Sequence, residues 1–150
     1  MKALQDEYGP DTICFGCGPA NEAGLQIKSF VEGDEVVADF TPQDHHQAFP
    51  GVINGGIIGA LFDCHMNWTA AHHLKGDGEE LPVTVTAEYS VKLRRPTPAG
   101  TPLHLTAHIT ESSGSRATVE ATLLADDVVC AEASGKFVAV EEGHPAYHRW

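Results

Sequence analysis

Positive charge is scarce in this sequence. Only nine of its 150 residues are Lys or Arg, against 21 Asp and Glu, so the formal net charge at pH 7 is -12. Proteins that bind nucleic acids usually present a basic surface to the phosphates, so we expect no nucleic-acid partner. Three of the nine cations, Lys92, Arg94 and Arg95, nevertheless fall within four positions. This cluster indicates either a local anion site or the solvated end of a strand.

Long apolar runs are also absent. No stretch reaches the roughly 18 residues that a membrane-spanning helix needs, and the start from Met1 to Glu7 lacks the apolar core of a signal peptide. We therefore expect a cytoplasmic protein with no membrane partner. At 150 residues, the chain is expected to form a single domain around one core.

Metal and redox motifs are incomplete. The segment Cys14-Phe15-Gly16-Cys17 has the spacing of half a zinc site or of a redox pair, but no second close pair exists, and Cys64 and Cys130 stand alone. A redox pair would open a helix, whereas Gly18-Pro19 predicts a turn. The nine histidines form no His-Glu-x-x-His motif, and the glycines match neither phosphate-loop pattern. We expect no metal and no redox cofactor.

The most informative pattern lies between Phe49 and Asp63. A turn signal at Pro50-Gly51 leads through Asn54 to the pair Gly55-Gly56, and then to a helix predicted over about residues 56–74. Apolar side chains cover so much of this helix that it must be largely enclosed. Glycines at the start of a helix let a ligand approach the unpaired N–H groups of the first turn, which would stabilise an electron-rich oxygen.

Asp63 is the one carboxylate inside this apolar segment. Burying it costs free energy unless it is hydrogen-bonded or faces a cleft, and burial raises its pKa. The alternative interpretation is a helix residue that faces solvent or caps a neighbour. Asn67, one turn later on the same face, is consistent with a polar seam or with a hydrogen-bonded core amide.

The remaining segments predict β structure. Residues 1–23 form an irregular N-terminal strap in this interpretation, and residues 141–150 form a peripheral tail or an interface element. A hairpin is predicted from Leu25–Phe30 and Val36–Phe40. Four strands rich in β-branched residues should follow the helix, at residues 83–93, 103–110, 117–124 and 128–140.

These elements predict an α+β fold, in which a curved antiparallel sheet of five or six strands wraps around one long central helix. The connections between the last three strands are short, so those strands should be consecutive antiparallel neighbours. Long strands leave long edges, and pairing two copies edge to edge would cover them. We therefore expect a homodimer.

Four elements, in this order, resemble the hotdog-fold acyl-CoA thioesterases of the PaaI-like branch, in the superfamily of 4-hydroxybenzoyl-CoA thioesterase. The resemblance runs from Cys14 to about Val140. Its elements are Cys-Phe-Gly-Cys-Gly-Pro with Asn21 and Gly24-Leu25, the loop Pro50-Gly51 to Gly55-Gly56, the helix Gly-Gly-Ile-Ile-Gly-Ala-Leu-Phe-Asp, and the strand end Leu93-Arg94-Arg95-Pro96 with Gly100.

The resemblance implies hydrolysis of an acyl-CoA to a free acid and CoA, at sites shared across the interface of a homodimer or a dimer of dimers. In that family an acidic residue nine positions after a histidine acts as base or nucleophile, and here it is Asp63. Gly55 and Gly56 would polarise the thioester carbonyl, with the N–H near Gly56 as the oxyanion donor. Thr86, or Thr84 after a small change of register, would orient the attacking water.

Arg94 and Arg95, with Lys92 beside them, would then meet the phosphates of CoA. CoA enters only as part of the substrate, so the resemblance implies no separate cofactor.

One position departs from the family pattern. The family commonly has His-Gly-Gly where this sequence has Asn54-Gly55-Gly56, and an Asn does not titrate near neutral pH. Cys64 also stands where close relatives often carry a second acid. Two alternatives follow: a non-catalytic hotdog protein that binds acyl-CoA or another ligand, and a hotdog dehydratase or hydratase. A dehydratase or hydratase normally pairs a His with an acid, so Asn54 disfavours that alternative.

Overall fold

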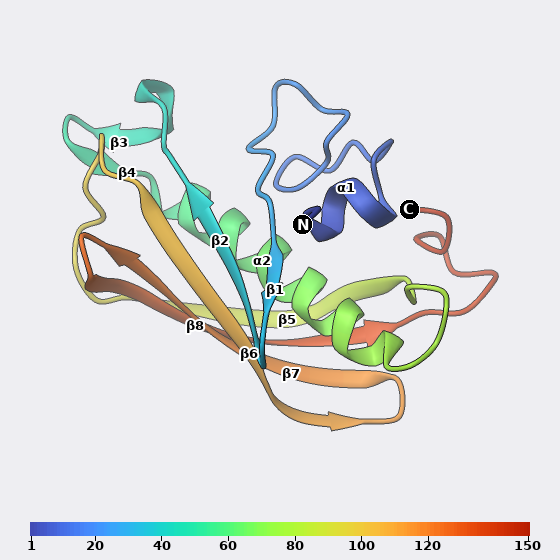
Figure 1. The fold of residues 1–150 in the computed structure, drawn as a ribbon. Coiled ribbons are helices and arrows are strands. Elements are labelled where there is room, and N and C mark those ends of the chain that lie inside the picture. The colour runs from blue at the N-terminus through green and yellow to red at the C-terminus, as the bar shows by residue number, and fades with distance from the viewer.

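A six-stranded antiparallel sheet wraps around one long helix in the computed structural model, which describes all residues from 1 to 150 (Figure 1). The order of strands across the sheet is β1-β2-β6-β7-β8-β5. Their bounds are β1 Phe30–Glu32, β2 Glu35–Phe40, β5 Thr84–Leu93, β6 Leu103–Ser113, β7 Arg116–Ala125 and β8 Val128–Ala139. The predicted α+β hotdog architecture is confirmed, as are the consecutive neighbours β6, β7 and β8.

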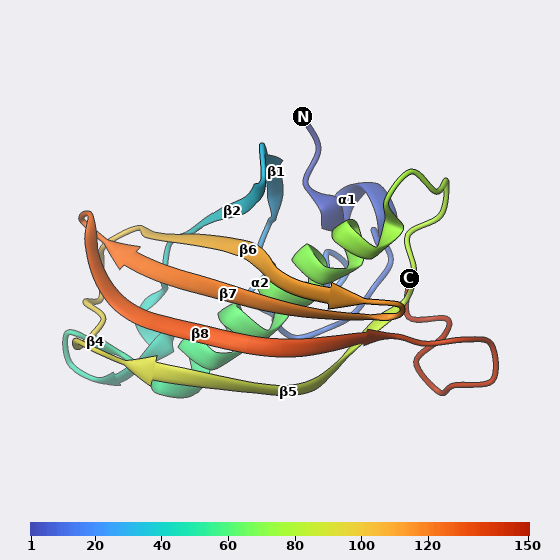
Figure 2. The same ribbon diagram turned by 90° about the horizontal axis from the view of Figure 1, so that it is seen from below.

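The central helix α2 spans Gly55–Lys75 and confirms the predicted helix. It ends at Gly76, whose φ of 54° is a conformation that suits glycine. One side of α2 contacts β5, β6, β7 and β8, which Figure 2 shows from below. Side chains on several sides of the helix, including Leu61, Phe62 and Trp68, are completely buried. The helix is thus enclosed around its circumference, as its apolar composition requires.

The N-terminal strap covers the side of α2 that the sheet leaves open (Figure 1). It contains a short helix, α1 (Leu4–Tyr8), that the sequence analysis did not predict. A Cβ added at Gly16 would lie 2.4 Å from Cys64 Sγ on α2. Glycine at this position therefore lets the strap backbone touch the helix.

The predicted strand Leu25–Phe30 is wrong except at its last residue. Only Phe30 belongs to β1, although burial still alternates along residues 25–29. The N–H groups of Leu25 and Ile27 donate to carbonyls of the strap at Phe15 and Gly16 instead of to a strand. The alternating sequence pattern therefore predicted the burial of residues 25–29 correctly. These residues form backbone hydrogen bonds with the irregular strap, however, and not with a strand.

The segment between β2 and the central helix contains short regular elements. It holds a 3-10 helix at Asp44–His46 and a small two-stranded sheet of β3 (Gln47–Phe49) and β4 (Val52–Ile53). The Asn54 N–H donates to the His46 carbonyl at 2.9 Å. This bond anchors the residue that begins α2.

The C-terminal tail lies outside the sheet, yet its end is tied to the core. The Trp150 ring stacks on the Trp68 ring with their centroids 4.6 Å apart. Arg149 Nη1 donates to the Thr84 carbonyl at 3.2 Å. Among the helices, none combines the length and apolar character needed to cross a membrane.

His65 is a completely buried polar residue of α2. Its Nε2 lies 2.9 Å from the Val36 carbonyl, which only accepts, so Nε2 carries the proton. Its Nδ1 then accepts from the Ser29 hydroxyl at 2.8 Å. Burial lowers the pKa of His65 from 6.5 to about 4, because charging the ring would require solvation that the core lacks.

We predict that His65 lowers the free energy of unfolding as the pH decreases from about 6.5 to about 4. In this range the unfolded chain binds a proton at His65 and the folded protein does not, so acidification favours unfolding. The full effect is roughly 3 kcal/mol, from ~1.4 kcal/mol per pKa unit. Urea unfolding of wild type and His65→Gln across this range measures it. The variant should show a shallower pH dependence, and equal slopes would contradict the assignment.

Candidate functional site

Asp63 and Thr86 meet where α2 crosses β5. The Thr86 hydroxyl donates to Asp63 Oδ1 at 2.6 Å, and the carboxylate is half-buried. Desolvation raises the pKa of Asp63, and the hydrogen bond from Thr86 opposes this increase. Thr84, the other threonine considered, is completely buried and its hydroxyl is 3.5 Å from the Asn67 carbonyl. Thr86 is therefore the threonine that contacts the carboxylate.

A bulge in β5 adds a residue that the sequence analysis missed. The register with β8 shifts between Thr86 and Glu88, so simple alternation fails there. As a result Tyr89 lies against α2, with its hydroxyl 3.5 Å from where a Cβ at Gly59 would stand. Desolvation raises the pKa of Tyr89, and the charge of Asp63 adds to the increase. No sequence signal marks such a bulge, because Ala87 is an unremarkable strand residue.

Asn54 caps the N-terminus of α2. Its Oδ1 accepts from the Gly56 N–H at 2.7 Å and the Ile57 N–H at 3.3 Å, as N-cap asparagines do. The Gly56 N–H, predicted as the oxyanion donor, is therefore already engaged. The first helical residue, Gly55, is exposed, and no cap or intrahelical bond uses its N–H. The group available to an incoming oxygen is the Gly55 N–H.

The cap and the carboxylate are far apart within one chain. Asp63 follows Gly55 by eight residues, which at 1.5 Å per residue is roughly 12 Å along the helix axis. A single carbonyl group cannot contact both. The structure therefore does not bring Gly55 and Gly56 together with Asp63 and Thr86 in one protomer.

The predicted basic cluster does not converge on this region. Lys92 lines a polar pocket, where its neighbours include Glu35, Glu120 and Glu132. Arg94 Nε donates to Glu132 Oε2 at 2.8 Å. Arg95 is exposed and forms no ion pair. Acidic neighbours disfavour an anion at Lys92, so Arg95 is the cation best placed to meet one.

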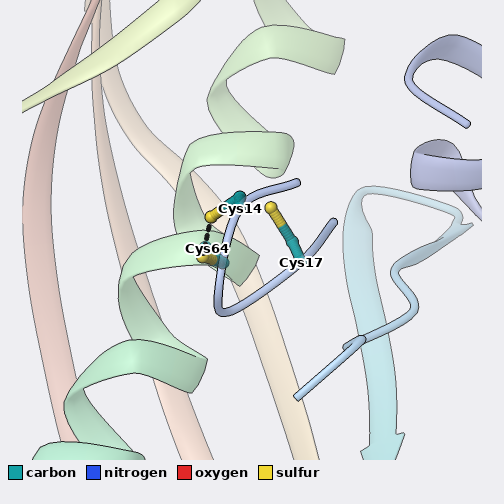
Figure 3. A group of neighbouring side chains, drawn as sticks. All are labelled: Cys14, Cys17 and Cys64. Atoms are coloured by element: carbon teal, nitrogen blue, oxygen red, sulfur yellow. Dashed lines mark hydrogen bonds between the residues drawn. The ribbon is translucent and has the colours of Figure 1, made fainter. Parts of the chain in front are cut away.

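Three cysteines gather on the other side of α2. Cys14 and Cys17 of the strap and Cys64 of the helix have their sulfur atoms within 4.8 Å of one another, as Figure 3 shows. Cys64 therefore does not stand alone, contrary to the interpretation from sequence. Spacing along the chain could not reveal this, because Cys64 is 50 residues beyond Cys14.

Comparison with known families decides where this fold belongs. The family described as the thioesterase superfamily matches residues 50–132, more than half of the chain. The match covers α2 with Asp63, β5 with Thr86, and the strand end with Arg94 and Arg95. The chain belongs to the thioesterase superfamily.

Several solved structures are similar to this chain. A thioesterase superfamily protein from Shewanella loihica PV-4 is 30% identical, with a TM-score of 0.65, and the match covers 82% of this chain and 98% of that one. PaaI from the phenylacetic acid degradation operon of E. coli is 16% identical, with a TM-score of 0.66 and coverage of 78% and 81%.

An uncharacterized protein from Pyrococcus horikoshii has a TM-score of 0.68 at 17% identity, covering 87% of this chain and 95% of its own. The last two likenesses concern the fold alone. No curated protein matches the chain. The resemblance noted from the sequence is thus confirmed for the family and for the hotdog fold.

The contribution of the Asn54 N-cap to stability can be measured by substitution. We predict that Asn54→Ala lowers the free energy of unfolding by about 0.5–2 kcal/mol, because the Gly56 and Ile57 N–H groups lose their acceptor. Asn54→Asp keeps an acceptor of the same shape and should remain near wild type. Urea denaturation of the three proteins measures the difference. Equal stability of Asn54→Ala and wild type would show that the cap contributes nothing.

Proposed function

We propose that the protein hydrolyses an acyl-CoA thioester to a free acid and CoA, with Asp63 as general base or nucleophile. The observation that carries the proposal is the 2.6 Å hydrogen bond from Thr86 to Asp63 Oδ1. It holds one carboxylate oxygen in place and leaves the second free to act on water or on the carbonyl. The raised pKa of Asp63 also makes it a stronger base than a solvated aspartate.

The proposed oxyanion donor is the Gly55 N–H. The cap leaves this group unused, and the dipole of a 21-residue helix adds positive potential at the same point. A preorganised donor of this kind often contributes ~2.7–4 kcal/mol to a transition state. Asn54 Oδ1 accepts hydrogen bonds from the Gly56 and Ile57 N–H groups. These bonds fix the first turn of the helix and so the orientation of the Gly55 N–H.

A complete site then requires two protomers. Since Gly55 and Asp63 are roughly 12 Å apart along α2, one chain would supply the oxyanion donor and its partner the carboxylate. The edge strand β5 suits this pairing because it is ten residues long and has no neighbour on one side. Its side chains Tyr89 and Leu93 are 42% and 58% exposed, which is unusual for large apolar groups. We therefore expect a homodimer, or a dimer of such dimers.

The first test replaces the proposed base. Asp63→Asn keeps the shape of the side chain and an oxygen for Thr86, but the amide is not a base. We predict that it lowers kcat for acyl-CoA hydrolysis by at least about 100-fold. A thiol-reactive dye that reports released CoA measures the rate across a panel of acyl-CoA esters.

Asp126→Asn, a change in the exposed turn between β7 and β8, is the matched control and should retain full activity. Light scattering on the same preparations should give the mass of at least two 16.0 kDa chains for every variant. Undiminished turnover by Asp63→Asn would overturn the proposal. Thermal stabilisation by acyl-CoA without thiol release from wild type would favour the non-catalytic binding protein instead.

The second test concerns Arg95. We propose that its guanidinium meets a phosphate of CoA, because Arg95 is exposed, forms no ion pair as Arg94 does, and does not line the acidic pocket of Lys92. Arg95→Ala should raise KM for acyl-CoA by about tenfold, equivalent to ~1.4 kcal/mol, and leave kcat unchanged. The same acyl group on N-acetylcysteamine, which lacks the phosphates, should show no such effect.

Arg116→Ala is the control for this test, since Arg116 begins β7 at the opposite end of the sheet. It should behave as wild type with both substrates. An equal loss with both thioesters after Arg95→Ala would contradict a phosphate contact.

A further inference from the structure

The cysteine cluster shares no residue with the proposed thioesterase site, although it lies next to it, and it is built from two distant segments. Cys14 Sγ and Cys64 Sγ are 3.6 Å apart, and Cys17 Sγ completes a triangle with no side longer than 4.8 Å (Figure 3). Cys17 and Cys64 are 2% and 9% exposed, and Cys14 is half-buried. Packing alone does not require three cysteines at this place, since apolar side chains would fill the space as well.

The triangle has the size of a thiolate metal site. Zinc–sulfur bonds of about 2.3 Å in tetrahedral geometry place the sulfurs about 3.8 Å apart. The Cys14–Cys64 separation is already within a few tenths of an ångström of that value. Small side-chain rotations would bring Cys17 to the same distance.

The loop that carries Cys14 and Cys17 is shaped for this convergence. The Gly18 N–H donates to the Cys14 carbonyl at 2.8 Å, which closes a tight turn around the two cysteines. A Cβ at Gly18 would lie 2.4 Å from the Cys14 nitrogen, so the turn depends on glycine. Gly16 likewise lets the same loop approach Cys64. Both glycines therefore serve to bring the three sulfurs together.

The surroundings favour a thiolate at Cys14, whereas hydrogen bonding to Cys14 and burial raise the pKa of the Cys17 and Cys64 thiols. Hydrogen bonds from the thiols of Cys17 and Cys64 lower the pKa of Cys14, and the N–H groups of Cys17 and Gly16 add to this effect. The Trp68 indole N–H is completely buried without a hydrogen-bond partner, and the nearby Cys17 sulfur is a group whose pKa it lowers. This N–H is a donor that a thiolate at Cys17 would satisfy.

We propose that Cys14, Cys17 and Cys64 bind a thiophilic metal ion such as Zn²⁺, which clamps the N-terminal strap to α2. Binding releases the three thiol protons to solvent, and the complex of Zn²⁺ with three thiolates carries a net charge of −1. Water completes the coordination from a pocket of about 490 Å³ that Cys14 and Cys17 line. The role is structural, because the ion ties the strap to the helix.

The experiment uses the full chain, stripped of metal by a chelator under reducing conditions. Titration with Co²⁺ should give sulfur-to-metal charge-transfer absorption and tetrahedral d–d bands that saturate at one ion per chain. Zn²⁺ should displace Co²⁺ and raise the Tm, since it binds the folded state. Cys14→Ser should weaken Zn²⁺ binding by at least about 100-fold in competition with a chromophoric chelator.

Cys130→Ser is the matched control, because Cys130 is also a buried free cysteine but lies in β8, outside the cluster. It should bind metal as wild type does. Alkylation of wild type followed by mass spectrometry gives a second measurement that needs no variant: Zn²⁺ should protect Cys14 from the reagent. Absence of the Co²⁺ bands, or equal binding by Cys14→Ser and wild type, would overturn the proposal. Pairing of Cys14 with Cys64 as a disulfide under oxidised glutathione, without Zn²⁺ protection of the reduced protein, would also overturn it.

Discussion

The structure depends on the need to enclose a helix that is apolar around its circumference. A single sheet covers only one side of α2, so another segment must cover the rest, and the strap does this. The requirement explains why the strap is closely bound to the helix without being a strand. It also explains the glycine at position 16, where any side chain would collide with Cys64. The ring of Trp150 covers Trp68 for the same reason.

Enclosure also gives the polar residues of α2 different chemical roles. His65 faces the core, where two hydrogen bonds hold it neutral. Asp63, two positions before it on another side of the helix, reaches β5 and is bound by Thr86. Cys64 lies between them in sequence and points to the strap. Three consecutive side chains thus serve a carboxylate site, a thiol cluster and a core hydrogen-bond network, because successive helical residues point about 100° apart.

Asn54 fixes the start of the central helix. The side chain is a strong N-cap, so the helix begins at the same place that the glycine pair requires. The same bond occupies the Gly56 N–H, so the Gly55 N–H is the group that stays unpaired at the start of the helix. The charge at this position is fixed, since a carboxamide does not titrate near neutral pH.

The sequence by itself determined the helix, the four long strands after it, the α+β class and the family, because hydrophobic periodicity and turn residues are local signals. It also singled out Asp63 and Thr86, whose contact the structure contains. Tertiary structure alone decided the strap's pairing with residues 25–29, the bulge that turns Tyr89 toward α2, and the acidic surroundings of Lys92. Tertiary structure also decided that Cys14 and Cys17 lie next to Cys64. Each of these depends on which segments become neighbours in space, and packing around α2 decides that.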